Sequence, residues 1–320
     1  VSLRRLRDPW DLQRVLATHG FRFPRIGSHS EEFDERNERW LVKRPFSSGG
    51  LGVRWLRPSE SFPRREHDYL QRWISGPSIS AAFVASDQAT RLIGVTRQWL
   101  RRDVAGTVAN PGEFQYLGSV ACDVSSWVVD GVAATTRFAQ LGNLIANEYG
   151  IRGLFGIDAV LRPQADGDWE LYVIEVNPRY TASMEVLEQA LDQAIVSAHL
   201  AACGHEATAI QGFVEPKRCS GSTTAGDRQG ESPCFAGKAV VYAEHDCHIP
   251  ACFLAKIERS NQGRIWPIVA DIPRIGQQIR QQQPVVTVLA AGSSATEVEA
   301  QLGLRERGGL LREFQPARTG

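Results

Sequence analysis

The sequence lacks an excess of charge of either sign. Its 320 residues include 36 lysines and arginines and 36 aspartates and glutamates, so the formal net charge at pH 7 is zero. Proteins that bind nucleic acid or an anionic membrane surface usually carry a basic surplus, because lysine and arginine hold the phosphate groups. We therefore expect neither nucleic acid nor a membrane as a partner.

The sequence also has no apolar run that would span a bilayer. The nearest approach, "AIVSAHLAAC" (residues 194–203), has only about half the length that a transmembrane helix needs. The N-terminal stretch "VSLRRLRDPW" is basic but contains no apolar segment of the kind found in signal peptides. The first residue is Val1, which indicates either an unusual start codon or a fragment.

Cysteine is scarce, with six residues at irregular spacings. Such a pattern favours reduced thiols over a disulfide framework, so we expect a cytoplasmic protein. The stretch "EHDCHIPAC" (residues 244–252) groups two cysteines with two histidines, which would suit zinc. It lacks the paired spacing of zinc motifs, and a loop with incidental His and Cys is the preferred interpretation.

What is present suits a soluble globular protein with a substantial core, since 42% of the residues are hydrophobic. Capping signals and helical periodicity predict helices over residues 8–19, 128–149 and 184–203. Alternating apolar residues predict strands over residues 39–45, 71–74, 78–85 and 91–100, and a hairpin of residues 153–163 with residues 169–179.

The composition changes after this part of the chain. Residues 215–233 are rich in glycine, serine, threonine and charge, which predicts a linker. Short strands and one helix should follow it. We therefore expect four regions: a first subdomain with a glycine-rich loop (1–70), a second subdomain (71–212), a flexible linker (213–236) and a small β-rich C-terminal module (237–320).

A glycine-rich loop follows the first of these strands. In "LVKRPFSSGGLGV", Lys43 ends the strand and the serines and glycines come directly after it. Glycine lets backbone N–H groups approach an anion closely, and a nearby lysine adds positive charge. The loop is neither a Walker A motif nor a dinucleotide fingerprint. By itself it indicates either a phosphate-binding loop or an ordinary turn.

The predicted hairpin carries acidic residues on one face. Asp158 lies on its first strand, and Glu175 and Asn177 lie two residues apart on its second strand. Two carboxylates and an amide oxygen are ligands that Mg²⁺ prefers. A solvated strand face is the alternative, but the neighbouring Val173 and Val176 indicate a buried strand.

The order of these features resembles the ATP-grasp superfamily. The set consists of Lys43 with its loop, the "QRWI" segment (residues 71–74), "GID" (residues 156–158) and "EVNPR" (residues 175–179). The resemblance covers roughly residues 8–200. It implies an α+β fold in which two α+β subdomains clasp ATP. Residues 155–161, 173–188 and 270–290 are similar to the ATP-grasp carboligases related to biotin carboxylase, one branch of which contains the tyramine–glutamate ligases of one-carbon cofactor synthesis.

The resemblance implies a role for each matching residue. Arg179 would contact the γ-phosphate or the oxyanion at the acyl carbon, and Lys43 would neutralise the transferring phosphate. Gln98 would face the phosphate or substrate pocket. The residues that would hold the nucleotide are Lys43, Ser47, Ser48, Gly49, Gly50, Gly52, Gln71 and Ile74. The residues that would bind Mg²⁺, with Mn²⁺ as an alternative, are Asp158, Glu175 and Asn177.

Two features depart from the family pattern. The lysine that many members carry in the first helix is replaced by the pair Asp8-Pro9, and Arg14 is a candidate substitute. Almost nothing precedes Asp8, where the family normally has a further domain. We expect Trp40, Trp55 and Trp73 to be packing residues beside the cleft. Arg101 and Arg102 indicate either solvated surface or a contact with an anionic substrate.

The resemblance implies an ATP- and Mg²⁺-dependent ligase that joins a small carboxylate to an amine through an acylphosphate. The resemblance is also compatible with a homodimer. One alternative is a carboxylase that activates bicarbonate, but here the acid after Arg179 is Glu185, two positions later than in biotin carboxylases, and their histidine is absent. The other alternative is a non-catalytic ATP-binding subunit.

Overall fold

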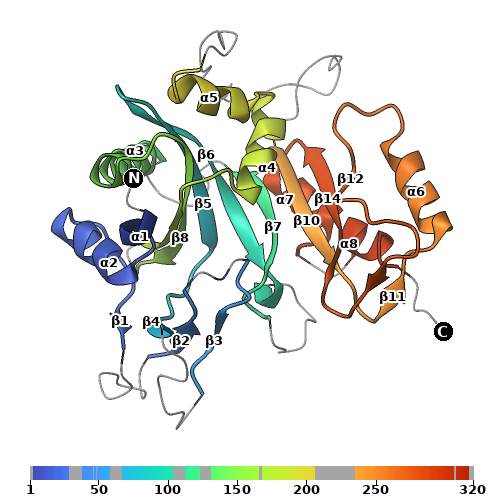
Figure 1. The fold of residues 1–320 in the computed structure, drawn as a ribbon, viewed down its shortest axis with the longest axis horizontal. Helices are drawn as coiled ribbons and strands as arrows, with labels where there is room; N and C mark the ends of the chain where they lie inside the picture. The colour runs from blue at the N-terminus through green and yellow to red at the C-terminus, as the bar shows by residue number, and fades with distance from the viewer. Residues whose placement is uncertain are drawn as a thin grey trace.

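The computed structural model describes residues 3–28, 38–45, 47, 49–57, 67–103, 112–122, 131–165, 168–205, 235–305 and 308–316 (Figure 1). Helices α1 (Leu3–Leu6) and α2 (Pro9–Thr18) lie at the N-terminal end. Asp8 caps α2 by accepting a hydrogen bond from the backbone N–H of Trp10 at 2.9 Å, and proline at the first helical position costs no hydrogen bond. The helix predicted over residues 8–19 is confirmed.

A small antiparallel sheet follows, with strand order β1-β4-β2-β3. Its strands are β1 (Ile26–Gly27), β2 (Trp40–Lys43), β3 (Val53–Trp55) and β4 (Tyr69–Arg72). Trp40, Val42 and Leu70 pack together on one face. Lys43 and Gln71 alternate with them and therefore lie on the other face. The expected subdomain boundary at residues 70 and 71 falls inside β4.

A large antiparallel sheet forms the centre of the molecule, with strand order β12-β14-β10-β7-β6-β5-β8-β9. Its strands are β5 (Ser78–Ala85), β6 (Thr90–Leu100), β7 (Tyr116–Cys122), β8 (Gly153–Pro163), β9 (Trp169–Asn177), β10 (Phe235–Tyr242), β12 (Val269–Ala270) and β14 (Pro284–Gly292). The strands predicted over residues 78–85 and 91–100 are confirmed as β5 and β6, which pair with each other, and the predicted hairpin of β8 with β9 is confirmed too.

Helices cover both faces of this sheet. On one face, α2 and α3 (Gly131–Tyr149) bury Leu16 and Leu141 against Phe83 and Phe155, whose rings stack at 5.0 Å. On the other face lie α4 (Ala182–Leu191) and α5 (Ile195–Ala202). The sequence predicts one helix over residues 184–203, but Asp192 takes up a left-handed conformation with φ of 52° and separates two helices.

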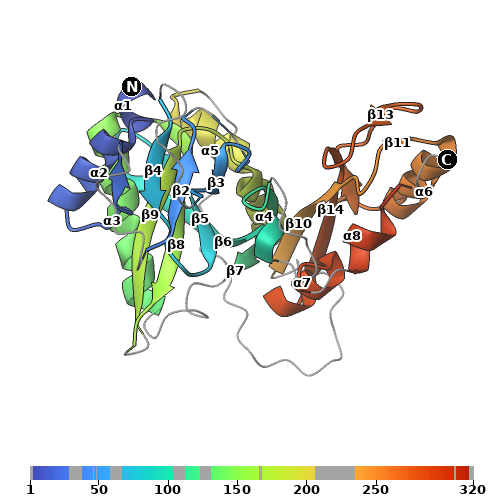
Figure 2. The same cartoon turned by 90° about the horizontal axis from the view of Figure 1, so that it is seen from below.

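The C-terminal residues extend the same sheet. Strand β10 pairs with β7 on one side and with β14 on the other. The remaining elements are α6 (Ala251–Asn261), α7 (Ala295–Leu302), α8 (Gly309–Glu313), β11 (Cys247–His248) and β13 (Gln278–Ile279). Figure 2 shows α6, α8, β11 and β13 at the opposite end of the molecule from α1 and α2, with α7 nearer the middle beside β10. The expected β-rich module is therefore continuous with the central sheet and includes three helices.

The predicted linker lies mostly outside the described residues, which resume at Phe235. Phe235 and Ala236, which the sequence analysis assigns to the linker, are the first residues of β10. Within the described ranges, the search for a helix with the length and apolar character of a membrane span found none.

Candidate active site

Two carboxylates face each other across the β8–β9 hairpin. Asp158 and Glu175 are cross-strand partners, so their side chains share a face of the sheet. Asn177 lies two residues further along β9, and its Nδ2 donates a hydrogen bond to Oδ2 of Asp158 at 3.0 Å. The fold thus brings together the three residues that the sequence predicts as metal ligands.

Asp158 is also connected to the neighbouring strands. Nε2 of Gln98, on β6, donates a hydrogen bond to its Oδ1 at 3.1 Å. The pKa of Asp158 is raised to about 6, first by burial and then by the charge of Glu175, while hydrogen bonds from Ser80 and Gln98 oppose the shift. Two adjacent carboxylates and an amide form a donor set that suits a divalent cation.

Arg179 follows β9 directly and stays in contact with this donor set. Its Nη2 donates to Oδ1 of Asn177 at 3.4 Å, and its Nη1 donates to the carbonyl oxygen of Tyr180 at 3.1 Å. The side chains of Arg179 and Glu175 are both exposed. A guanidinium group therefore lies beside the carboxylates with room to meet an incoming anion.

The small sheet contributes Lys43 and Gln71. The Lys43 Nζ donates a hydrogen bond to Oε1 of Gln71 at 3.2 Å. Gln71 is only 2% exposed, and its Nε2 has no hydrogen-bond partner within the described part of the chain. An unsatisfied buried amide costs about 1–3 kcal/mol, so a ligand that supplies an acceptor fits this position. The family resemblance implies that Gln71 is one of the residues that hold the nucleotide.

The glycine-rich loop passes close to the large sheet. Gly49 and Gly50 have φ values of 61° and 79°, which favour glycine. A Cβ atom on Gly50 would lie 1.9 Å from the carbonyl oxygen of Phe114. The carbonyl of Gly49 accepts a hydrogen bond from the backbone N–H of Tyr116 at 3.0 Å. The loop therefore bridges from the small sheet to β7.

Other loop residues shape the turn itself. Ser47 Oγ donates to the carbonyl of Arg44 at 2.9 Å, and a Cβ on Gly52 would lie 2.2 Å from that Oγ. Ser48 lies outside the described residues. Ile74, another predicted nucleotide contact, is buried after β4 and packs against Val160.

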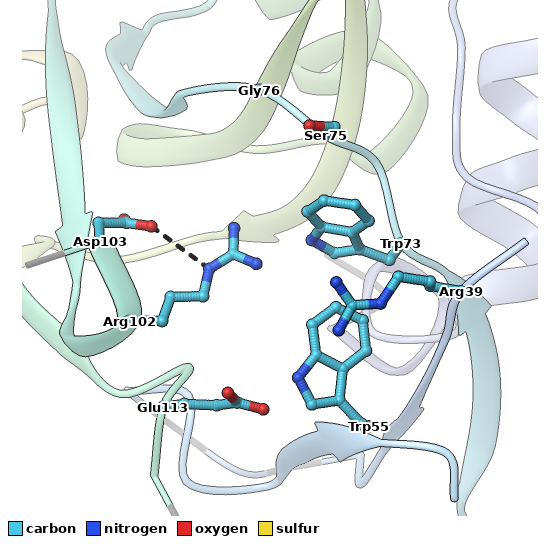
Figure 3. Close-up of a pocket in the computed structure, with 8 residues that line it drawn as sticks. All are labelled: Arg39, Trp55, Trp73, Ser75, Gly76, Arg102, Asp103 and Glu113. Atoms are coloured by element: carbon cyan, nitrogen blue, oxygen red, sulfur yellow. Dashed lines mark ion pairs between the residues drawn. The ribbon is translucent and has the colours of Figure 1, made fainter. Parts of the chain in front are cut away.

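A cavity of about 430 Å³ lies beside the segment that follows β4 (Figure 3). Trp55 and Trp73 line this cavity, whereas the sequence predicts that they are only packing residues beside the cleft. Arg39 lies 3.6 Å from the centre of the Trp55 ring, and Arg102 lies 5.4 Å from the Trp73 ring. Of the three tryptophans considered, Trp40 is the one in a core. The sequence did not predict that Arg39 lines this cavity, because one arginine before a strand forms no pattern.

Two weaker candidates from the sequence take other places. Arg14 pairs with Asp11 on the same helix at 2.7 Å, so its charge is engaged there and not with the site. In the described ranges, a search for three or more grouped His, Cys, Asp or Glu side chains suited to a metal found none. In residues 244–252, Cys247 and His248 form β11, and Cys252 lies in α6.

Comparison with known proteins identifies the family. The ATP-grasp domain matches residues 6–183, more than half of the chain, and the chain belongs to this family. No curated protein matches the sequence. Several solved structures resemble the fold at 11–16% sequence identity, and a likeness at this distance shows the fold alone.

Three of these structures illustrate the range. An L-amino acid ligase from Bacillus licheniformis is 16% identical with a TM-score of 0.60, over 93% of this chain and 70% of the other. A carboxyaminoimidazole ribonucleotide synthase from Aspergillus clavatus, complexed with ATP, is 12% identical with a TM-score of 0.62, over 94% and 72%. The biotin carboxylase domain of a 2-oxoglutarate carboxylase from Hydrogenobacter thermophilus, with MgADP and bicarbonate, is 13% identical with a TM-score of 0.59, over 91% and 63%.

Proposed function

We propose that this protein is an ATP- and Mg²⁺-dependent ligase that joins a small-molecule carboxylate to an amine through an acylphosphate. The observation that carries the proposal is the arrangement at the end of β9. There, Asp158 and Glu175 face each other, Asn177 bonds Asp158, and Arg179 bonds Asn177. The arrangement supports the proposal, because two carboxylates with an amide suit a divalent cation, and phosphoryl transfer to a carboxylate needs such a cation and a nearby positive group.

Each part of the site has a defined task in this proposal. Asp158, Glu175 and Asn177 would hold Mg²⁺, which would neutralise phosphate charge. Lys43 and the glycine-rich loop bind the phosphates, and Gln71 offers its free N–H to the base. Arg179 stabilises charge on the transferring phosphoryl group and on the oxyanion at the acyl carbon. Positioning and charge stabilisation then account for catalysis without a protein nucleophile.

Hydroxylamine trapping tests the proposal without knowledge of the natural amine. The chain is incubated with Mg-ATP, hydroxylamine and single carboxylic acids, chosen from dicarboxylates and amino acids. We expect ADP and a coloured iron–hydroxamate complex in equal amounts with at least one acid. The absence of hydroxamate and of acid-dependent ADP release with every acid would overturn the proposal.

The same assay separates the other functions. Phosphate release that depends on bicarbonate and gives no hydroxamate would favour the carboxylase. ATP binding with no turnover would favour a binding subunit. A glutamate-type acid with an aromatic amine, as in one-carbon cofactor biosynthesis, is the pair that the sequence resemblance suggests for the first trials.

A further inference from the structure

Lys238 is the one lysine or arginine that is buried among the residues that the structure describes, with 8% of its surface exposed. It lies on β10, and its Nζ donates a hydrogen bond to Oε2 of Glu185 on α4 at 2.5 Å. Burying an ammonium group costs several kcal/mol unless a partner compensates for it. Helix α4 already packs on the sheet through Met184 and Leu187, so anchoring alone does not explain the pair.

A row of polar side chains joins this pair to the predicted metal ligands. Cross-strand neighbours run from Lys238 to Ser119 and from Ser119 to Gln98. Gln98 in turn donates its hydrogen bond to Asp158. Since adjacent strands lie about 4.8 Å apart, the backbones of Lys238 and Gln98 are about 10 Å apart. The pair therefore lies on the same sheet face as the site, within the reach of a small substrate.

Tyr116 lies between the two ends of this row. Its hydroxyl is 2.7 Å from Oγ of Ser119. Burial raises the pKa of the Tyr116 phenol, and the charges of Asp158 and Glu185 both raise it further. Both carboxylates are therefore near the same neutral side chain, Tyr116.

Glu185 is oriented for contact with a ligand. It lies in the first turn of α4, six residues after Arg179, where the helix dipole favours a negative charge. Its side chain is 34% exposed, and the bond to Lys238 fixes Oε2. Its Oε1 accepts no hydrogen bond from any residue in the described ranges. One carboxylate oxygen is therefore held and the other is open.

We propose that Glu185 binds the acceptor amine and removes a proton from it, and that Lys238 positions Glu185 for this task. The inference rests on the proposed ligase function. The charge of Glu185 favours binding of the acceptor amine over binding of the donor carboxylate beside this side chain. Glu185 attracts an ammonium group, whereas a donor carboxylate would meet its negative charge, because Lys238 is already neutralised.

The proton balance defines the step. The amine arrives as R–NH₃⁺ and ends as an amide with one N–H, so it loses two protons. Glu185 removes the first proton and passes it to solvent. The C–N bond then forms while the C–O bond to phosphate breaks. The leaving phosphate keeps that electron pair and takes the second proton as HPO₄²⁻. Carboxylate, ammonium and ATP thus yield amide, ADP, HPO₄²⁻ and one proton.

A comparison of two acceptors tests the inference. Hydroxylamine is unprotonated at neutral pH and needs no base for the first step, whereas primary amines such as tyramine, methylamine and amino acids arrive protonated. Glu185→Gln keeps the acceptor oxygen for Lys238. We expect it to lower kcat with the best primary amine on the order of 10²-fold or more. Hydroxamate formation and the affinity for a fluorescent ATP analogue should change no more than about threefold.

The positioning residue is tested in the same way. Lys238→Met should also depress amide formation more than hydroxamate formation, because it leaves Glu185 without its fixed partner. Lys238→Gln, which retains a hydrogen-bond donor, is the second variant if the first is unstable. The matched controls are Glu188→Gln and Lys256→Met. Glu188 lies on α4 with Glu185 and accepts hydrogen bonds from Tyr180 and Ile195, and Lys256 lies on α6. Both should affect the two acceptors equally.

The outcomes separate this inference from the proposed function. A parent protein that forms no hydroxamate with any acid removes the proposed function itself. A parent that uses hydroxylamine but no protonated amine overturns the inference alone. Equal losses with both acceptors in Glu185→Gln and Lys238→Met, accompanied by a lower Tm, would identify the pair as a structural connection and would also overturn it.

Discussion

At the scale of single residues, hydrogen bonds between neighbouring side chains hold the end of β9 in place. Asn177 uses its N–H on Asp158 and its oxygen on Arg179, so one amide links a carboxylate to a guanidinium. Gln98 holds the other oxygen of Asp158. Such linked contacts fix the geometry before a ligand arrives, which reduces the ordering cost on binding.

Glu175→Gln should abolish ATP turnover while the protein stays folded. The variant removes one charged ligand of the proposed Mg²⁺ and preserves the side-chain volume at an exposed position. Turnover is measured as ADP release with saturating Mg²⁺, and folding is measured by Tm. The matched control is Glu170→Gln on the same strand, whose side chain pairs with Arg22. Parent-level turnover in Glu175→Gln would show that Glu175 is not a ligand.

Arg179→Lys should separate chemistry from nucleotide binding. A guanidinium group contacts two oxygens at once and a lysine cannot, and the charge on those oxygens changes during transfer. We expect kcat to fall on the order of 10²-fold or more, with nearly unchanged affinity for Mg-ATP. Titration calorimetry with a non-hydrolysable analogue and single-turnover rates provide the two readouts. Arg91→Lys, at the exposed start of β6, is the control. Lost affinity with normal chemistry would instead make Arg179 a binding residue.

At the scale of elements, the glycine-rich loop depends on how closely it approaches its neighbour. Gly50 lies against the backbone of Phe114, whereas a Cβ on Gly49 would meet no atom within 4 Å. Both residues have positive φ, but only Gly50 lacks space for a side chain. Substitutions at Gly49 and Gly50 therefore separate the effect of backbone strain from the effect of steric exclusion.

Gly50→Ala should lower kcat/KM for ATP much more than Gly49→Ala. The Gly50 variant must displace the loop from Phe114, and a displacement of about 1 Å at a phosphate loop can cost on the order of 10²-fold in rate. The Gly49 variant carries only the left-handed strain, about 1–2 kcal/mol. Values of kcat/KM for ATP and Tm values for both variants test this. Equal effects would mean that the contact with Phe114 is unimportant for the nucleotide.

At the scale of the whole molecule, the large sheet joins segments that are distant in the sequence. Strand β10, which follows the predicted linker, pairs with β7, and Lys238 on β10 bonds Glu185 on α4. Backbone hydrogen bonds and a shared apolar core cross this junction. The two sides of the linker should therefore remain associated without a covalent connection.

Limited trypsin digestion should cut the chain within residues 215–233 and leave the pieces together. Lys217, Arg218 and Arg228 are the cleavage sites in that segment, whose composition is typical of protease-sensitive linkers. We expect two fragments on a denaturing gel and one peak at the parent position in size exclusion. Replacing the three basic residues by glutamine should prevent the cut. A first cut within residues 150–200, or separate elution of the fragments, would contradict the prediction.

The sequence by itself determined the local elements and the order of the motifs. The β8–β9 hairpin follows from two alternating strands around a turn, and the alternation also places Asp158 and Glu175 on one face. The positive φ of Gly49 and Gly50 follows from glycine in a turn. These properties depend on residues close in the chain, so a linear pattern is sufficient to predict them. The family assignment follows from their order.

Only the tertiary structure decided which distant residues meet. Lys238 and Glu185 are 53 positions apart, and Gln98 and Asp158 are 60 positions apart. No periodicity encodes such contacts, because they depend on the order of strands in the sheet. The same order joins the C-terminal strands to the central sheet, although their composition indicates a separate module. The physical reason is that β7 would otherwise be an edge strand with unpaired backbone N–H and C=O groups. Strand β10 pairs with these groups.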